Sequence, residues 1–467
     1  MSKLLHQTSI EPLDQESAEK LEKLQELCKE FHLSDDQLLQ VEQIMVLEIN
    51  LSLGKLTNPS SNIKSYITYV SELPTGDESG VYLALDLGGT NFRVLLIEIE
   101  RNTKSMRTKN AKHAVSEDLM KGSGGQLFNF MADKIKEFME EHELLGRKYH
   151  MGFTFSFPIH QHSLSSAELA TWTKGFVCSG VEGQDVVKLL DTALKRHPDI
   201  DIEICAILND TTGCLIACAY KRPDCAVGVI IGTGTNASYV EDISNVDLYE
   251  GCTGEKKNVV INTEWGALGN TGSLDFIRTP FDRVVDMESK NVGKQIYEKL
   301  ISGMYLGELT RLVILEAVQQ QIIFTDERKT ILDRFRTKDI FLTRYLSEIE
   351  SDELDSYSCT FSVLKELGLE MHATQFDCKL LRFICESISM RSAFLAAAGV
   401  SALLKKMGRK KVTVGVDGSL YKQHPHFQCR MHEKISQLLG ISTSFKLVLS
   451  EDGSGRGAGL VAAVCHK

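Results

Sequence analysis

The triplet Gly-Thr-Asn occurs twice in the chain, beginning at Gly89 and again at Gly234, and both copies lie between apolar, β-branched segments. The first copy joins VYLALDL to FRVLLIEIE, and the second joins AVGVII to ASYVEDI. A tight glycine turn between two such segments predicts a strand, a turn and a second strand. The repetition, although weak, predicts two similar halves that face each other and offer one glycine turn each to a shared ligand.

Helical and strand-like segments alternate along the rest of the chain. Residues 16–53 have the spacing of two helices, the second beginning after Ser34 as its N-cap and ending at Gly54. Residues 125–145 and most of 290–410 are also helical in spacing, whereas KYHMGFTFSFP and KVTVGVDGSLY predict strands. GSGRGAGLVAAV predicts a glycine run that opens an apolar helix. This mixture places the chain in the α/β class.

The length, composition and net charge of the chain exclude several classes of protein. The 467 residues are 43% hydrophobic and 25% charged, which is typical of a globular enzyme and excludes a disordered or collagen-like chain. The net charge of −11 has the wrong sign for a nucleic-acid-binding protein, so any phosphate must be held locally. The 12 cysteines include no CxxC pair, and no segment approaches the roughly 18 apolar residues that span a bilayer. We therefore expect a reduced, cytoplasmic, monomeric enzyme without a signal peptide or membrane anchor.

Three glycine-rich turns are candidate phosphate sites: Gly88–Gly89, Gly232–Gly234 and Gly453–Gly457. Without a Cβ atom the backbone can wrap an anion with its N–H groups. One such turn is more often purely structural, but three that each follow a strand favour a nucleotide. Asp86 ends the first of these strands and, with Arg93 nearby to offset phosphate charge, predicts a carboxylate that holds a hydrated Mg²⁺ on a nucleotide.

Two other functions fit parts of this pattern. Gly232-x-Gly234-x-x-Ala237 matches a dinucleotide fingerprint, which favours an NAD-dependent dehydrogenase. That fingerprint must open a helix, however, and ASYVEDI predicts a strand. A non-catalytic sugar sensor, or an actin-like ATP-binding scaffold with the same turns, is the second alternative.

Two patterns have simpler structural interpretations. His426, Cys429 and His432 fall on neighbouring turns of a predicted helix that starts near Pro425, and without a second ligand cluster they predict a helix surface rather than a zinc site. The acidic run at residues 348–355 predicts a solvated helix face.

Polar residues cluster at strand ends where a sugar would need them. Asn209-Asp210-Thr211 follows ICAIL, NTEWG (residues 262–266) follows NVVI, and TWTKG (residues 171–175) lies between two helical stretches. Each sugar hydroxyl needs a donor and an acceptor, which carboxylates, amides and lysine supply together. Their recurrence predicts a polyhydroxylated ligand.

Ten segments together resemble the eukaryotic hexokinase family, in its single-unit, glucokinase-sized form, in order from about residue 16 to the end. They are LDLGGTNFRV, GFTFSFP, WTKGF, NDT, IIGTGTNASY, NTEWGALG, YEKLISGMYLGEL, LTRYLSEIESD, VTVGVDGSLYKQHP and SEDGSGRGA. The resemblance implies a two-lobed, actin-like (ribonuclease H-like) α/β fold with ATP and hexose in the cleft. We expect N-terminal helices in residues 1–74 that pack with the large lobe, a small lobe of residues 75–208 joined by the C-terminal helix of 450–467, and a large lobe of residues 209–449.

The resemblance also implies the reaction: phosphorylation of the 6-hydroxyl of glucose, mannose or fructose by ATP, the first step of glycolysis, with glucose-induced lobe closure. Asp210 would be the general base, and Lys174 would offset charge on the transferred group. Hexose would be bound by Ser156, Phe157, Thr173, Lys174, Asn209, Asp210, Asn236, Glu264 and Glu298. Regulatory protein partners are compatible with this family. Inhibition by glucose 6-phosphate, with its phosphate among the Asp86 turn, Asp417, Ser419 and Ser454, is a further expectation.

The nucleotide site that the resemblance implies is larger. It would be formed by Asp86, Leu87, Gly88, Gly89, Thr90, Asn91, Arg93, Thr233, Gly234, Gly303, Met304, Thr343, Arg344, Tyr345, Leu346, Ser347, Ser419, Leu420, Tyr421, Lys422, Gln423 and Ser454. Mg²⁺ would arrive with ATP and reach Asp86 through water, without a direct protein ligand. Two residues depart from the family pattern: Leu268 stands where many relatives have Phe, and Thr212 where Val is common. Both changes are conservative in size and leave the reaction unaffected, although they could tune lobe closure.

Overall fold

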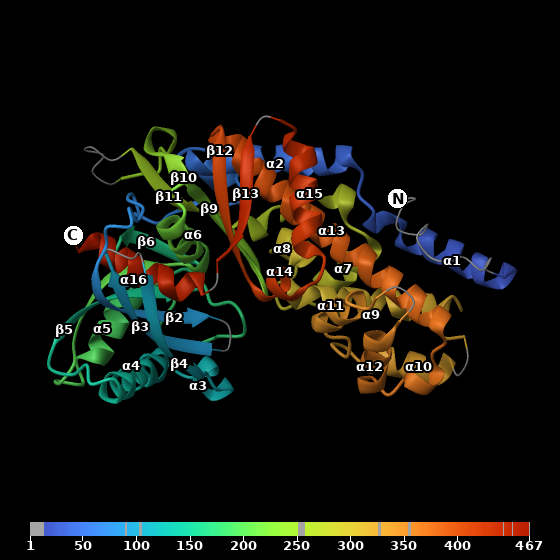
Figure 1. The fold of residues 1–467 in the computed structure, drawn as a ribbon, viewed down its shortest axis with the longest axis horizontal. Coiled ribbons are helices and arrows are strands. Elements are labelled where there is room, and N and C mark those ends of the chain that lie inside the picture. Colours follow the sequence, from blue (N-terminus) through green and yellow to red (C-terminus); the bar gives the residue numbers. More distant parts are fainter. Residues whose placement is uncertain are drawn as a thin grey trace.

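The computed structural model describes residues 14–88, 91–101, 105–250, 257–325, 328–353, 356–441, 443–450 and 452–466. Two mixed β-sheets form the centres of two lobes, a small lobe and a large lobe (Figure 1). The predicted strand–turn–strand units begin both sheets. The turn residues Gly89 and Thr90 themselves lie outside the described residues.

The small lobe is built on five strands in the order β4-β3-β2-β5-β8. Strands β2, β3 and β4 are antiparallel, whereas β5 and β8 run parallel to β2. Leu83 and Leu85 of β2 face a core shared with helices α4 and α5, while Ala84 faces the C-terminal helix α16. The bounds are β2 Gly80–Gly88, β3 Asn91–Glu100, β4 Ser105–Ala114, β5 Lys148–Phe155, β8 Asp201–Leu208, α3 Glu117–Lys121, α4 Gly124–Glu141, α5 Val186–Leu194 and α16 Gly453–Cys465, with a hairpin of β6 Ile159–Ser163 and β7 Ser166–Leu169.

The large lobe repeats this order. Its sheet runs β1-β11-β10-β9-β12-β13, so that apart from the short edge strand β1 it again has three antiparallel strands followed by two parallel ones. The duplicated topology confirms the two-lobed α/β fold. The bounds are β1 Tyr66–Ile67, β9 Cys225–Ile231, β10 Thr235–Asp242, β11 Asn258–Asn262, β12 Lys411–Asp417 and β13 Ser444–Leu449.

Helices surround the large-lobe sheet and extend away from it (Figure 1). The N-terminal helices α1 and α2 pack against the long helix α13, and Leu24, Cys28 and Phe31 are buried there. Ser34 caps α2 with a capping box, and the helix ends before Gly54, as its sequence predicts. The bounds are α1 Gln15–Cys28, α2 Asp35–Leu53, α6 Asp210–Lys221, α7 Pro280–Met287, α8 Ile296–Ile301, α9 Gly303–Gln319, α10 Arg328–Phe335, α11 Thr343–Glu350, α12 Ser358–Glu366, α13 Gln375–Met407, α14 Ser419–Gln423 and α15 Phe427–Leu439.

Helix α13 corrects the expectation that nothing in the chain resembles a membrane span. Among the described residues it alone has the length and average hydropathy of such a span, but 89% of the apolar window is buried inside the protein. It also carries Arg391, which forms a fully buried ion pair with Asp282. Helix α13 is therefore the central core helix of the large lobe.

The described part of the acidic run, residues 348–353, is only partly the solvated face that its composition predicts: Glu353 is exposed, but Glu350 and Asp352 are buried. Glu350 is 1% exposed and accepts hydrogen bonds from Arg430 Nη1 at 2.8 Å and His424 Nε2 at 3.1 Å. Burial alone would raise the pKa of Glu350, but the bonds and charges of His424 and Arg430 lower it to about 2. Asp352 is buried as well, and its carboxylate accepts hydrogen bonds from two backbone N–H groups in the first turn of α12.

The histidine-rich segment before and within α15 is structural, as expected. His426 Nε2 lies 3.1 Å from the backbone oxygen of Glu350, Cys429 donates to Glu433, and His432 packs on Phe445. Within the described residues these three side chains do not converge on one point. They offer no zinc site.

Candidate active site

Asp210 lies where the two lobes meet. Strand β8 of the small lobe ends at Leu208, and α6 begins two residues later, so Asn209 becomes the helix N-cap and accepts a hydrogen bond from Thr212 N at 3.2 Å. The next residue, Asp210, opens the helix. Burial raises the pKa of Asp210, and the charge of Lys174 lowers it only in part. A buried carboxylate with a raised pKa is suited to act as a general base.

Lys174 reaches Asp210 from the small lobe. Its backbone is left-handed (φ 55°), and its Nζ donates to the backbone oxygen of Ser156 at 2.7 Å. The ammonium lies 5.6 Å from the centre of the Phe157 ring, which packs edge-on against Trp172 at 4.8 Å. An aromatic cluster behind the lysine therefore fixes its position, and Phe157 contributes support rather than a polar contact.

Glu264 comes from the large lobe, directly after β11. Its Oε1 accepts hydrogen bonds from Asn236 Nδ2 at 3.0 Å and Asn262 Nδ2 at 2.9 Å. Its backbone is left-handed (φ 51°), a conformation that non-glycine residues rarely adopt and that is concentrated at functional sites. Burial raises the pKa of Glu264, although the two amide bonds oppose the shift.

Glu298 completes the group from α8. Its Oε2 accepts a hydrogen bond from the backbone N–H of Thr235 at 3.0 Å, and burial raises its pKa to about 7. The charge of Lys174 lowers the pKa of Asp210, of Glu264 and of Glu298. One ammonium therefore serves three carboxylates.

These contacts bring Lys174 and the carboxylates of Asp210, Glu264 and Glu298 together at the lobe junction. Lys174 and its chain neighbour Thr173, with Ser156, come from the small lobe, whereas the three carboxylates follow the crossover at residue 208. This group can accept hydrogen bonds from several hydroxyl groups and can take one proton. Sequence reasoning did not include Asn262 in the site, although the segment NTEWG contained it.

Arg93 connects the small-lobe turn to α16. Its Nη2 contacts Asp86 Oδ2 at 2.5 Å, its Nη1 contacts Asp452 Oδ1 at 2.8 Å, and Ser454 Oγ donates to Asp86 Oδ2 at 2.8 Å. The sequence predicted an arginine that offsets phosphate charge, but the structure holds it between two carboxylates. Asp452 is not among the residues predicted from the sequence. The only feature of the sequence that could have indicated it is an acidic residue directly before a glycine run.

The residues next to this turn that were predicted to face the nucleotide differ in which of their atoms are available for contact. The side chain of Leu87 is buried in the small-lobe core, which corrects the prediction that it faces the nucleotide: only its backbone is available, and its oxygen already accepts from Ser156 N at 3.0 Å. A Cβ atom at Gly88 would lie 3.2 Å from Ser156 Oγ, so this position favours glycine. Asn91 begins β3.

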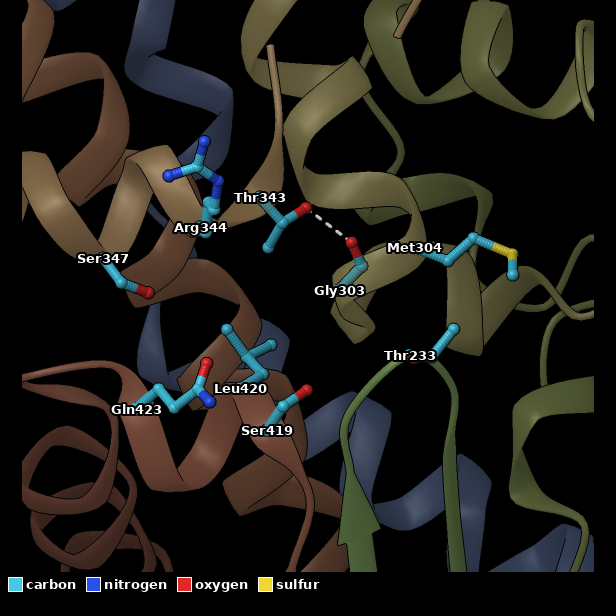
Figure 2. A pocket seen from close by; sticks show the side chains of 9 residues that line it. All are labelled: Thr233, Gly303, Met304, Thr343, Arg344, Ser347, Ser419, Leu420 and Gln423. Carbon is cyan, nitrogen blue, oxygen red and sulfur yellow. Dashed lines mark hydrogen bonds between the residues drawn. The ribbon is translucent and has the colours of Figure 1, made fainter. Parts of the chain in front are cut away.

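A cavity of about 190 Å³ opens in the large lobe (Figure 2). The N-terminus of α9 forms one wall because Gly303 N donates to Gly232 O at 2.8 Å and Met304 N to Thr233 O at 3.1 Å. The Thr343 hydroxyl at the start of α11 donates to Gly303 O, and α14 lies across the cavity from α11. The cavity is lined by Thr233, Gly303, Met304, Thr343, Arg344, Ser347, Ser419, Leu420 and Gln423, which are all predicted nucleotide residues.

Five of the predicted nucleotide residues in the large lobe do not line this cavity. Tyr345, Leu346 and Tyr421 have buried side chains in the large-lobe core, so only their backbone could face a nucleotide. Their neighbours line the cavity because the 3.6-residue period of a helix turns some side chains to the core and others to the cavity. Lys422 is exposed, and Gly234 lies beside Glu298.

The comparisons with known proteins cover nearly the whole chain. Two family models, both described as Hexokinase, match residues 23–220 and 226–464. A hexokinase from Schistosoma mansoni is 43% identical over 447 residues, which covers 96% of this chain and 98% of that protein. Hexokinase-2 from Homo sapiens is 42% identical over 459 residues, and the chain spans about half, 49%, of its length. A structure of the Schistosoma mansoni hexokinase complexed with glucose superposes with a TM-score of 0.89 over 96% of this chain and 100% of that one.

Proposed function

Because the chain belongs to the hexokinase family, we propose that it transfers the γ-phosphoryl group of ATP to the 6-hydroxyl of D-glucose and related hexoses such as mannose and fructose. One observation carries this proposal: the buried carboxylates of Asp210, Glu264 and Glu298 converge with Lys174 where the lobes meet. The glucose complex of the Schistosoma mansoni relative supports glucose as the substrate.

Asp210 acts as the general base. Phosphoryl transfer leaves the protein little covalent work, so catalysis rests on alignment and on stabilising charge. The Asp210 carboxylate takes the proton of the 6-hydroxyl while that oxygen forms its bond to the γ-phosphorus and the bond to the ADP oxygen breaks. Burial, which raises the pKa of Asp210, makes it a stronger base than an ordinary aspartate. Lys174 offsets negative charge on the transferred group.

Hexose contacts on both lobes explain how ATP is protected from water. Ser156 and Lys174 lie on the small lobe, while Asn209, Asn236 and the glutamates lie on the large lobe. A hexose that bonds to both sets draws the lobes together and completes the site. Water alone cannot supply that binding energy, so ATP hydrolysis stays slow.

The nucleotide spans the large-lobe cavity and the glycine turns. Asp86 fits the Mg²⁺ that accompanies ATP, because its Oδ2 is bound by Arg93 and Ser454 whereas its Oδ1 accepts no hydrogen bond from the described residues. One free carboxylate oxygen suits a hydrated ion reached through water. When bound, Mg²⁺ supplies positive charge to the β- and γ-phosphates.

The product, glucose 6-phosphate, is also proposed to inhibit the reaction. Ser454 bonds to Asp86, and Gly453 N of the same turn donates to Asp417 at 3.2 Å, so the residues proposed for the phosphate of glucose 6-phosphate adjoin one another. A phosphate bound there would overlap the ATP phosphates. Inhibition should therefore weaken as the ATP concentration rises, and inhibition independent of ATP would contradict this pocket.

A coupled assay with purified protein tests the function. With glucose and ATP we expect one ADP for each glucose 6-phosphate formed, and little ADP without a hexose. An ATP-binding scaffold or a sugar sensor would release no hexose-dependent ADP. A dehydrogenase would instead change the nicotinamide absorbance when NAD⁺ is supplied with a reduced sugar or NADH with an oxidised one.

A further inference from the structure

A group of metal-binding side chains lies on the small lobe, at the far end of α16 from the turn that holds Arg93. Among the residues that the structure describes, His150, Glu203 and Cys205 are the one group of three or more potential ligands whose donor atoms all lie within 4.8 Å of one another. His150 is on β5, and the other two are on the neighbouring strand β8. The hexokinase reaction uses none of them.

The pairing of β5 with β8 explains why the three side chains meet. His150 is directly opposite Glu203 in the parallel register. Met151 then pairs with Ile204 but Gly152 with Ala206, so Cys205 is an extra, bulged residue. A bulge re-aims a side chain, and bulges are common beside binding sites. This one brings Cys205 Sγ to 3.3 Å from His150 Nδ1.

The distances match those between ligands of one ion. His150 Nδ1 lies 3.6 Å from Glu203 Oε2 as well as 3.3 Å from the sulfur. Zn–S bonds of about 2.3 Å and Zn–N or Zn–O bonds of about 2.0–2.2 Å, arranged tetrahedrally, separate the donors by roughly 3.3–3.6 Å. Thiolate together with imidazole favours Zn²⁺ over Mg²⁺ or Ca²⁺, which prefer oxygen ligands.

The group is open to solvent on one side. The ring of His466, immediately after the last residue of α16, packs 3.5 Å from the His150 ring, centre to centre, but His466 is not one of the residues whose donor atoms lie within 4.8 Å of one another. Lys148 Nζ contacts Glu203 Oε2 at 2.7 Å, but both side chains are more than half exposed, so this ion pair is weak and a divalent cation can displace it. The exposed side of Glu203 leaves the group open to solvent.

We propose that His150, Glu203 and Cys205 form a binding site for Zn²⁺, with a water molecule as the fourth ligand. On binding, the Cys205 thiol releases its proton to solvent and the sulfur bonds to the ion as thiolate. The ion ties β5 to β8, the two strands on which α16 packs. Because α16 also packs on α6, which carries Asp210, the ion stabilises the sheet beneath the helix that joins the two lobes.

Cobalt provides the test, because Co²⁺ bound by a thiolate has a charge-transfer absorption in the near ultraviolet. Protein freed of metal with a chelator is titrated with Co²⁺ and then with Zn²⁺. We expect one Co²⁺ per chain with a thiolate band that Zn²⁺ abolishes. Cys205→Ser should lose the band, whereas Cys429→Ser, which removes the cysteine of the other histidine-rich segment, should keep it.

A second variant and a second readout guard against misfolding. His150→Gln keeps the thiol and should weaken Co²⁺ binding at least about tenfold, with an unchanged far-ultraviolet circular dichroism spectrum. Excess Zn²⁺ should raise the melting temperature of the parent protein, because an ion that binds only the folded state stabilises that state. It should not raise the melting temperature of His150→Gln. A band of full intensity in Cys205→Ser, loss of the band in Cys429→Ser, or no Co²⁺ binding by the parent protein would overturn the proposal.

Discussion

Asp210, Glu264 and Glu298 share one cation, Lys174, where the two lobes meet. Three carboxylates beside a single ammonium are an expensive arrangement for a folded protein, because burial disfavours their charged forms. The pKa of each is raised as a result. Such a cluster is expected where a bound, hydroxyl-rich ligand offsets the free-energy cost of burying the carboxylates. The raised pKa values of these three residues therefore support a ligand-binding function.

Glu298→Gln should stabilise the protein at alkaline pH. The folded-state pKa of Glu298, about 7, lies above its ordinary value of 4.5, so ionising this side chain destabilises the fold as the pH rises from 4.5 through 7. Gln cannot ionise and still accepts the Thr235 N–H bond. We expect the melting temperature of the variant to exceed that of the parent by roughly 1–3 °C at about pH 8 and to differ little at about pH 5.

Glu117→Gln is the matched control for this pH series. Glu117 is exposed, and the hydrogen bond from Lys121 lowers its pKa, so its loss cannot give a gain that grows with pH. If Glu298→Gln shows no gain at alkaline pH, Glu298 is not held in a site that disfavours its charge.

Thr212 is one of the two residues at which the sequence is expected to depart from the family pattern. Its hydroxyl donates to Asn209 Oδ1 at 2.6 Å and lies 3.1 Å from Ser238 Oγ, so it supports the cap that precedes Asp210. Thr212→Val removes one buried hydrogen bond, worth about 1 kcal/mol, and should lower the melting temperature while changing kcat less than about threefold. Thr192→Val, on an exposed face of α5, should change neither. A large loss of kcat in Thr212→Val would make its hydroxyl part of the reaction.

At the scale of elements, α6 and α16 cross closely enough that their glycines touch. A Cβ atom at Gly457 would overlap the backbone of Gly213, and one at Gly213 would lie 2.8 Å from Ser454 O. Both helices also contact the sheets of their own lobes, so this crossing is the main connection between the two halves. The glycine run that opens α16 is therefore needed for helix packing, whatever it contributes to phosphate binding.

Gly457→Ala should separate these helices. Overpacking of this kind costs about 1–3 kcal/mol, and kcat should also fall because Ser454 of the same helix holds Asp86. Gly125→Ala on α4 is the matched control, since the nearest atom to its new methyl group would be 3.9 Å away, and it should be neutral or slightly stabilising. Thermal melting and steady-state kinetics measure both. Equal behaviour of the two variants would refute the close packing of α6 on α16.

Local patterns predicted most elements but not their partners. The glycine turns, the Ser34 cap and the strand before Asp210 follow from periodicity and turn chemistry, so the duplicated fold was predictable. The Arg93–Asp452 pair joins residues 359 positions apart, and no local pattern reveals it. The burial of Glu350 likewise depends on His424 and Arg430, which lie beyond the reach of a pattern in residues 348–355.

The resemblance named the nine residues that line the large-lobe cavity, and it also named Leu346 and Tyr421, whose side chains the helices turn into the core. A contiguous motif on a helix cannot present every side chain to one ligand. The domain bounds, the monomeric state and the cytoplasmic location stay predictions.

At the scale of the whole molecule, the proposed sugar contacts come from two lobes, which we expect glucose to draw together. Trp172 packs in the small lobe beside Lys174, and Trp265 is fully buried in the large lobe, where its Nε1 donates to Thr235 Oγ1 at 3.3 Å. Saturating glucose should change the intrinsic fluorescence and reduce the radius of gyration measured by X-ray scattering. Trp172→Phe and Trp265→Phe assign the fluorescence change to each lobe. An unchanged fluorescence and radius would contradict closure.

In the proposed reaction, Asp210 takes the proton in a site that binds hexose without its help. The most direct measurement compares Asp210→Ala with the parent protein, using the glucose dissociation constant and kcat from the same preparations. We predict that glucose affinity stays within about tenfold while kcat falls by roughly 10²-fold or more. Near-normal turnover in Asp210→Ala would contradict this account.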